Sequence, residues 1–213
     1  MRLLRWLIGI AVVAAIGWRF PLFHIVPQKT AVAEKAAVTF DAASFAESFW
    51  TNQLAAAMGK AVKAEVLIPA IYADAGSAKT NYSRSVDMGD AYFYFLSGTG
   101  KVLVVSEDEI ALTITPGATN AEISLQTGPV FGNAVRDGTG LLNASDYPNS
   151  QDFNDLSAAL NHIVETNVLP KLHEAKVGAT VAFAGCAEVD DESSDLKPLK
   201  VIPIQATMEG GKP

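Results

Sequence analysis

Strand-like sequence begins in the stretch Tyr92-Phe-Tyr-Phe-Leu-Ser-Gly-Thr-Gly-Lys-Val-Leu-Val-Val-Ser106. Its aromatic and β-branched residues predict two strands, and the Ser-Gly-Thr-Gly segment at 97–100 predicts a hairpin turn between them. Residues 109–115 follow with an apolar side chain at every second position, which is typical of a half-buried strand. The chain after Tyr92 is therefore predicted to be rich in β-structure.

Toward the C-terminus the pattern predicts one long helix and several more strands. Residues 149–167 carry apolar side chains at helical spacing, with Phe153 and Leu160 on one face. Asn149 or Ser150 is the expected N-cap of this helix. Further strands are predicted at 121–127, 130–135, 180–189 and 199–207.

Helical periodicity precedes the strands. Asp41 or Ser44 can cap a first helix, and Pro69 interrupts the pattern before helical stretches at 69–75 and 77–83. The whole pattern predicts an α+β fold: a small OB-like closed β-barrel of about six or seven strands, with N-terminal helices and one helix inserted before the last two strands. Closure is expected because it removes unpaired sheet edges.

The N-terminus has the features of an export signal. Arg2 and Arg5 precede an apolar run, and no acidic residue occurs in residues 1–26. The bulky Trp18–Phe23 segment disfavours peptidase cleavage, so we expect a retained signal-anchor with its N-terminus in the cytoplasm. A cleaved periplasmic form is the alternative.

The expected organisation beyond the anchor is simple. A linker covers residues 27–38, a single barrel domain covers 39–208, and a short tail covers 209–213. An exported location agrees with the single cysteine, Cys186, which cannot form a disulfide within the chain. We expect Cys186 to be a small buried side chain.

Charge narrows the possible partners. The chain has 16 Lys and Arg against 23 Asp and Glu residues, a net charge of −7. Because all charged residues of the anchor are basic, the rest of the chain carries a more negative net charge than the whole chain. Such a body does not favour binding to nucleic acid phosphates or to anionic lipid.

A polar cluster between the predicted strands supplies the candidate ligand-binding residues. On the functional interpretation these side chains converge on a polar ligand such as a sugar, and Tyr147 or Phe131 stacks on it. On the structural interpretation the arginine pairs with a carboxylate and the other residues cap a helix and shape turns. The candidates are Arg136, Asp137, Asn149, Gln151 and Asn154.

Other chemistry has weaker support. The sequence lacks the common catalytic motifs, so we expect no enzymatic activity. His162 and Glu165 share a helix face, but no third ligand is marked, and we expect neither a metal nor another cofactor. A carbohydrate-active enzyme that uses Asp137 or Asp146 for acid–base chemistry stays open as an alternative.

Three motifs carry a resemblance to a known family: Gly128-Pro-Val-Phe131, Arg136-Asp-Gly138 and Asp146-Tyr-Pro-Asn-Ser-Gln-Asp-Phe-Asn154. They resemble a bacterial family of unknown function whose members are described as predicted periplasmic lipoproteins. Genes of that family often lie beside ribose-type sugar ABC transporters. The chain departs from the lipoprotein pattern because no cysteine follows its apolar segment.

The resemblance implies a function without a named reaction. We expect an inner-membrane-anchored periplasmic accessory protein that assists a sugar ABC transporter. The expected partners are transporter components or the sugar-binding protein. A purely structural envelope protein is the other alternative.

Overall fold

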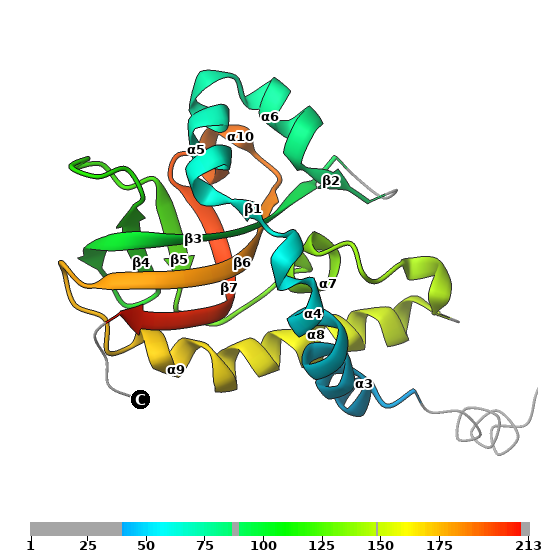
Figure 1. The fold of residues 1–213 in the computed structure, drawn as a ribbon. Helices are drawn as coiled ribbons and strands as arrows, with labels where there is room; N and C mark the ends of the chain where they lie inside the picture. The colour runs from blue at the N-terminus through cyan, green and yellow to red at the C-terminus, as the bar shows by residue number, and fades with distance from the viewer. Residues whose placement is uncertain (1–39, 87–89, 148, 210–213) are drawn as a thin grey trace, which may run out of the picture. The chain divides into compact units, whose positions relative to one another are not determined.

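A ring of five strands forms the centre of the computed structural model, which describes residues 40–86, 90–147 and 149–209 (Figure 1). The strands pair in the order β3-β4-β5-β7-β6, and β6 pairs with β3 to close the ring. β5 and β7 are parallel, and the other pairs in the ring are antiparallel. The strands are β3 (Tyr92–Val105), β4 (Glu109–Thr113), β5 (Ile123–Gln126), β6 (Thr180–Val189) and β7 (Leu199–Glu209).

Two short strands extend this sheet. β1 (Val62–Lys63) is parallel to β3, and β2 (Arg84–Ser85) is antiparallel to it. The closure of the ring confirms the predicted OB-like barrel, whose ring has five strands, and β1 and β2 bring the described sheet to the expected seven. Its core consists of fully buried ring residues, among them Leu96, Val102, Ile110, Leu112, Ile123, Leu125 and Val181.

The predicted long helix is present as α8 (Ser150–Asn167). Asn149 is its N-cap, since Asn149 Oδ1 accepts a hydrogen bond from Asp152 N at 2.8 Å. In the ribbon view α8 and α9 (Leu169–Leu172) run along one end of the barrel (Figure 1). α8 buries one side, including Leu156, Leu160 and Val164, as its apolar spacing predicts.

The remaining helices are short. Asp41 caps the first of them, because Asp41 Oδ1 accepts from Ser44 N at 3.0 Å. The segments before β3 are α3 (Ala42–Phe49), η1 (Trp50–Leu54), α4 (Ala55–Ala57), η2 (Met58–Lys60), α5 (Ala64–Ala73) and α6 (Ala75–Tyr82). Those after β5 are α7 (Ala134–Gly138), η3 (Ala144–Asp146) and α10 (Glu192–Asp195).

The predicted hairpin turn at 97–100 is wrong. β3 continues through this segment and pairs with β6 along it, from Ser97 opposite Ala184 to Gly100 opposite Val181. A Cβ at Gly98 would lie 2.6 Å from Ala64 Cβ, where α5 begins. Glycine is therefore needed here for the close approach of a helix, not for a turn.

Three other predicted boundaries also need correction. Residues 130–135 are not a strand, because 130–133 form a loop and α7 begins at Ala134. Pro69 does not end a helix but lies inside α5. The predicted tail begins within β7, whose last residue is Glu209.

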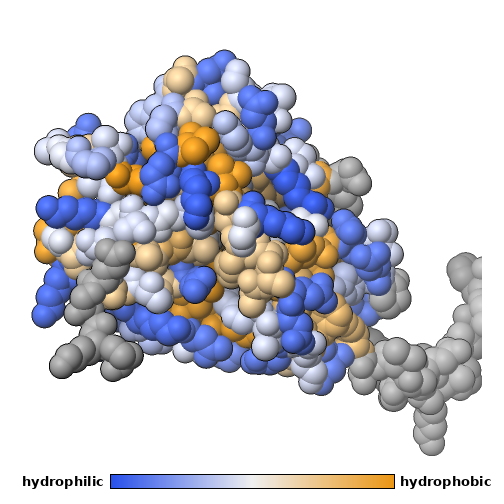
Figure 2. Space-filling model, viewed as in Figure 1, coloured by the Kyte–Doolittle hydropathy of each residue, from blue (hydrophilic) through white to orange (hydrophobic). Residues whose placement is uncertain are grey.

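The outer surface is mainly polar, but helix α5 exposes apolar side chains on it. On the face seen in Figure 2, hydrophobic residues interrupt the polar surface in the region of α5. Val66 and Tyr72 of this helix are exposed, whereas Leu67, Ile68 and Ile71 are buried. α5 is therefore apolar on both sides.

The predicted anchor lies outside the described residues, as do the linker at 27–38 and residues 210–213. In the part of the chain that the structure describes, we find no helix with the length and apolarity needed to cross a membrane.

Glu122 organises the connection between β4 and β5. Its Oε2 accepts hydrogen bonds from Ile114 N at 2.7 Å, Thr115 N at 2.9 Å and Thr113 Oγ1 at 2.9 Å. Burial opposes ionisation, but the bonds from Thr115, Ile114 and Thr113 outweigh it and hold the pKa of Glu122 below its ordinary value of 4.5.

Glu122→Gln is expected to lower the free energy of unfolding by about 1–2 kcal/mol near neutral pH, because it replaces a charged acceptor of several hydrogen bonds. A lowered carboxyl pKa contributes stability above the unfolded-state pKa and loses it as the pH falls through the folded-state pKa. The difference between parent and variant should therefore shrink between about pH 6 and pH 3. Urea unfolding across this range measures it, and a difference independent of pH would contradict the assignment.

Candidate functional site

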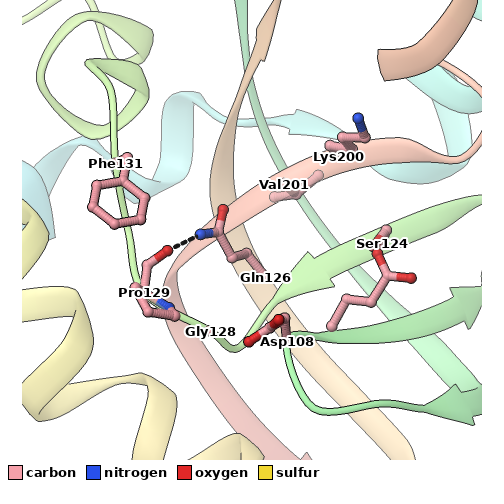
Figure 3. A pocket seen from close by; sticks show the side chains of 9 residues that line it. Asp108, Ser124, Gln126, Gly128, Pro129, Phe131, Lys200 and Val201 are labelled. Atoms are coloured by element: carbon pink, nitrogen blue, oxygen red, sulfur yellow. Dashed lines mark hydrogen bonds between the residues drawn. The ribbon is translucent and has the colours of Figure 1, made fainter.

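A pocket of about 340 Å³ lies on the outside of the ring, where β4, β5 and β7 are neighbours (Figure 3). Residues of the three strands line it together with the loop before β4 and the loop after β5. Its lining residues are Asp108, Glu109, Ser124, Gln126, Gly128, Pro129, Phe131, Lys200 and Val201.

Strand register brings the polar lining side chains to one face. Glu109 lies opposite Gln126 across the β4–β5 pair, and Ser124 lies beside Lys200 across the β5–β7 pair. Because successive side chains of a strand alternate between faces, the intervening Leu125 is turned away and fully buried.

Carboxylates dominate the charge of the pocket. Asp108 and Glu109 are exposed, and Ser124 Oγ donates to Glu109 Oε2 at 2.6 Å. The cationic lining residue, Lys200, donates from Nζ to Asp195 Oδ1 at 3.0 Å. The pocket therefore offers mainly hydrogen-bond acceptors, which suit hydroxyl donors. Its negative charge repels anions.

The loop after β5 closes one wall of the pocket. The Asp108 carbonyl accepts from Thr127 N at 2.7 Å and from Gly128 N at 3.1 Å. A Cβ at Gly128 would lie 2.3 Å from Asp108 Oδ1, so a larger residue at this position would displace the Asp108 side chain. The Gln126 side-chain amide donates to the Pro129 carbonyl and so joins the strand to the loop (Figure 3).

Two of the predicted site residues, Arg136 and Asp137, are buried in α7 and do not line this pocket. Arg136 Nε and Nη2 donate to the Asp137 carboxylate at 2.7 and 2.8 Å. Arg136 Nη1 donates to the Phe153 carbonyl at 3.2 Å, and the guanidinium lies 3.7 Å from the Phe153 ring centroid. These contacts tie α7 to α8, as the structural interpretation of Arg136 expects.

The other three predicted residues lie at the start of α8. Asn149 caps the helix through Asp152, Gln151 Nε2 donates to Asp155 Oδ1 at 2.6 Å, and Asn154 is exposed. None of the three lines the pocket. The structure thus separates the predicted residues into a buried ion pair and a helix start, and their ligand-binding role stays a prediction.

Sequence reasoning found one residue of the pocket and missed most of the others. Phe131 was one of two aromatics expected to stack on a ligand, and it lies at the edge of the pocket, whereas the other, Tyr147, does not line it. Glu109, Ser124 and Lys200 were missed because each is an ordinary polar residue on the outward face of a strand. Alternation predicts that outward face, but the sequence does not show which strands lie side by side.

A metal centre has no support among residues 40–86, 90–147 and 149–209. No group of three or more His, Cys, Asp and Glu side chains is arranged there to hold a metal ion. Glu165 Oε1 accepts from Val130 N at 2.8 Å, whereas His162 is exposed to solvent.

The chain matches a model of a known protein family. The family is described as "Predicted periplasmic lipoprotein (DUF2291)", and its model matches residues 10–207. This chain belongs to the DUF2291 family. The match confirms the family resemblance carried by the Gly128–Phe131, Arg136–Gly138 and Asp146–Asn154 motifs, and it describes a periplasmic lipoprotein of unknown function.

The fold of this DUF2291 protein is similar to that of a solved structure. The crystal structure of an OB-fold protein from Thermotoga maritima aligns with a TM-score of 0.71 at 22% sequence identity. The alignment covers 81% of this chain and 100% of the other. It confirms the predicted OB-like α+β fold, and no curated protein matches the chain.

The single cysteine of this DUF2291 protein is Cys186, in β6. It is 0% exposed, and burial raises the pKa of its thiol. A buried, protonated thiol is unreactive. Cys186 is therefore a core residue, as predicted, and is not accessible for lipid attachment.

Proposed function

We propose that this DUF2291 protein is a periplasmic accessory protein of a sugar ABC transporter, and that the pocket on β4, β5 and β7 binds a neutral sugar. In this proposal residues 1–26 anchor the chain in the inner membrane with the N-terminus in the cytoplasm. The barrel contacts the transporter or its sugar-binding protein in the periplasm. No reaction is assigned to the chain.

The observation that carries the proposal is the position and chemistry of the pocket. In OB folds the second and third barrel strands form the usual binding face for oligonucleotides and oligosaccharides. β4 and β5 are the second and third strands of this ring, and both line the pocket. The pocket volume falls within the range of small-molecule sites.

The charge of the lining supports the second of these two ligand classes. The carboxylates of Asp108 and Glu109 repel a phosphate backbone, and Lys200 is paired with Asp195. Sugar hydroxyls, in contrast, donate well to carboxylate and amide oxygens. The lining therefore favours a neutral, polyhydroxylated ligand.

Four further observations support the anchored, non-enzymatic form. Residues 1–26 combine two early arginines with an apolar run, and Cys186 is too deeply buried to carry a lipid. Of the carboxylates considered for acid–base chemistry, Asp137 is held by Arg136. Asp146 lies in η3, apart from the residues that line the pocket.

Sugar binding is the first test. Titration calorimetry of the full chain in mild detergent is expected to detect D-ribose binding, and D-ribose 5-phosphate should bind at least about tenfold more weakly because the carboxylates repel it. Glu109→Gln should weaken D-ribose binding about tenfold, since hydrogen bonds to charged acceptors are the stronger ones. Equal binding of the sugar and its phosphate would contradict the proposed ligand class.

Partner capture is the second test. The tagged full chain, purified from membranes in mild detergent, is expected to retain subunits of a sugar ABC transporter or its binding protein, identified by mass spectrometry. A chain that binds no neutral sugar and retains neither component is a structural envelope protein, and the proposed function is then wrong.

A further inference from the structure

Phe131 is exposed to an unusual degree. It is 78% exposed, more than any other large hydrophobic side chain that the structure describes. Its ring lies at the edge of the pocket, on the loop between β5 and α7 (Figure 3). A large exposed aromatic beside a polar pocket is a feature of ligand and partner sites.

α8 holds this loop on the C-terminal side of Phe131. Ser157 Oγ donates to the Gly132 carbonyl at 3.0 Å, and Asn161 Nδ2 donates to the same oxygen at 3.1 Å. Both side chains are buried. Ser157, Asn161 and Glu165 follow at intervals of four residues, so they form one polar row along the helix.

The N-terminal side of the loop is held as well. Glu165 Oε1 accepts from Val130 N at 2.8 Å. On the C-terminal side, Glu188 Oε2 of β6 also accepts from Asn133 N at 3.4 Å. Backbone groups on both sides of the exposed ring are therefore fixed by side chains of the barrel and its helix.

Such fixation has a direct consequence for binding. A ring presented on a rigid loop loses little conformational freedom when a ligand covers it, so more of the contact energy appears as affinity. The negative face of an aromatic ring attracts the C–H groups on the apolar face of a sugar. The Gln126 amide nitrogen is occupied by Pro129, which leaves its oxygen to accept a hydroxyl.

We propose that Phe131 is the stacking platform for the sugar ring in this pocket, and that Ser157, Asn161 and Glu165 are positioning residues that hold it. This inference rests on the proposed sugar-binding function. It adds to that function the group that recognises the ring and a row of helix residues that act through it.

The decisive measurement is D-ribose binding by the full chain. Phe131→Ala is expected to weaken binding at least about tenfold, while urea unfolding matches the parent because the side chain is exposed. Phe131→Trp should keep binding, and the emission of the introduced indole should shift when D-ribose is added. Val177→Ala, which removes another exposed apolar side chain, is the matched control and should bind as the parent does.

The positioning role has its own test. Asn161→Ala should weaken D-ribose binding in the parent background but add no further loss to Phe131→Ala, since both changes remove the same contact. Additive losses would show that Asn161 does not act through Phe131.

The outcomes also separate this inference from the function on which it rests. If Phe131→Ala binds D-ribose like the parent while Glu109→Gln does not, the pocket binds sugar without the platform and this inference is wrong. If the parent itself binds no D-ribose, this inference and the sugar-binding part of the proposed function are both wrong, and the partner capture tests the accessory role separately.

Discussion

Replacing Arg136 with glutamine is expected to lower the free energy of unfolding by about 3–5 kcal/mol, because it leaves a buried carboxylate without its partner. The side chains of Arg136 and Asp137 are 7% and 5% exposed. The change also removes the donor to the Phe153 carbonyl and the contact with the Phe153 ring. Urea unfolding of parent and variant measures the difference.

An exposed ion pair supplies the matched control for Arg136. Lys200→Gln breaks the Lys200–Asp195 pair, in which the lysine side chain is 57% exposed, and should cost less than about 1 kcal/mol. Arg136→Lys keeps the charge but loses the paired hydrogen bonds, so an intermediate cost is expected. Should Arg136→Gln unfold like the parent and lose D-ribose binding, Arg136 is a ligand contact and the structural interpretation is wrong.

Phe153→Ala and Leu160→Ala are each expected to lower the free energy of unfolding by about 2–5 kcal/mol, the range for large buried side chains replaced by alanine. Leu160 is 0% exposed and Phe153 is 8% exposed, both on the buried side of α8. Thermal melting and urea unfolding both detect losses of this size.

His162→Ala provides the control on the same helix. His162 is exposed, so its replacement should change the unfolding free energy by less than about 0.5 kcal/mol. If both core variants melt at the parent's temperature, the apolar side of α8 does not pack on the barrel, and the assigned role of this helix is wrong.

Several features of the protein followed from local sequence. The apolar spacing of residues 149–167 predicted α8, and Asn149 and Asp41 were each one of two expected caps, because a cap bonds an amide three residues away. β6 was predicted with its observed bounds, and closure of the barrel followed from the number of short strands. These features depend on interactions between residues that are close in the chain or on a regular pattern.

The candidate site was predicted only in part. The Arg136-Asp137-Gly138 motif was singled out from the sequence, but its environment was not determined by its sequence. An arginine beside an aspartate is equally compatible with an open ligand site and with a buried pair. The structure places the pair in a buried position against Phe153, and burial is a property of the packed structure.

Sequence patterns were enough to predict the class of fold, the long helix with two candidate caps, the acidic character of the body and the family resemblance. The unbroken course of β3 through Gly98 depends instead on tertiary packing, because this glycine makes room for Ala64, 34 positions earlier in the chain. The pocket likewise depends on register, which places Glu109, Ser124 and Lys200 on one outward face. Contacts between residues far apart in the chain are set by packing of the whole barrel, and no local pattern encodes them.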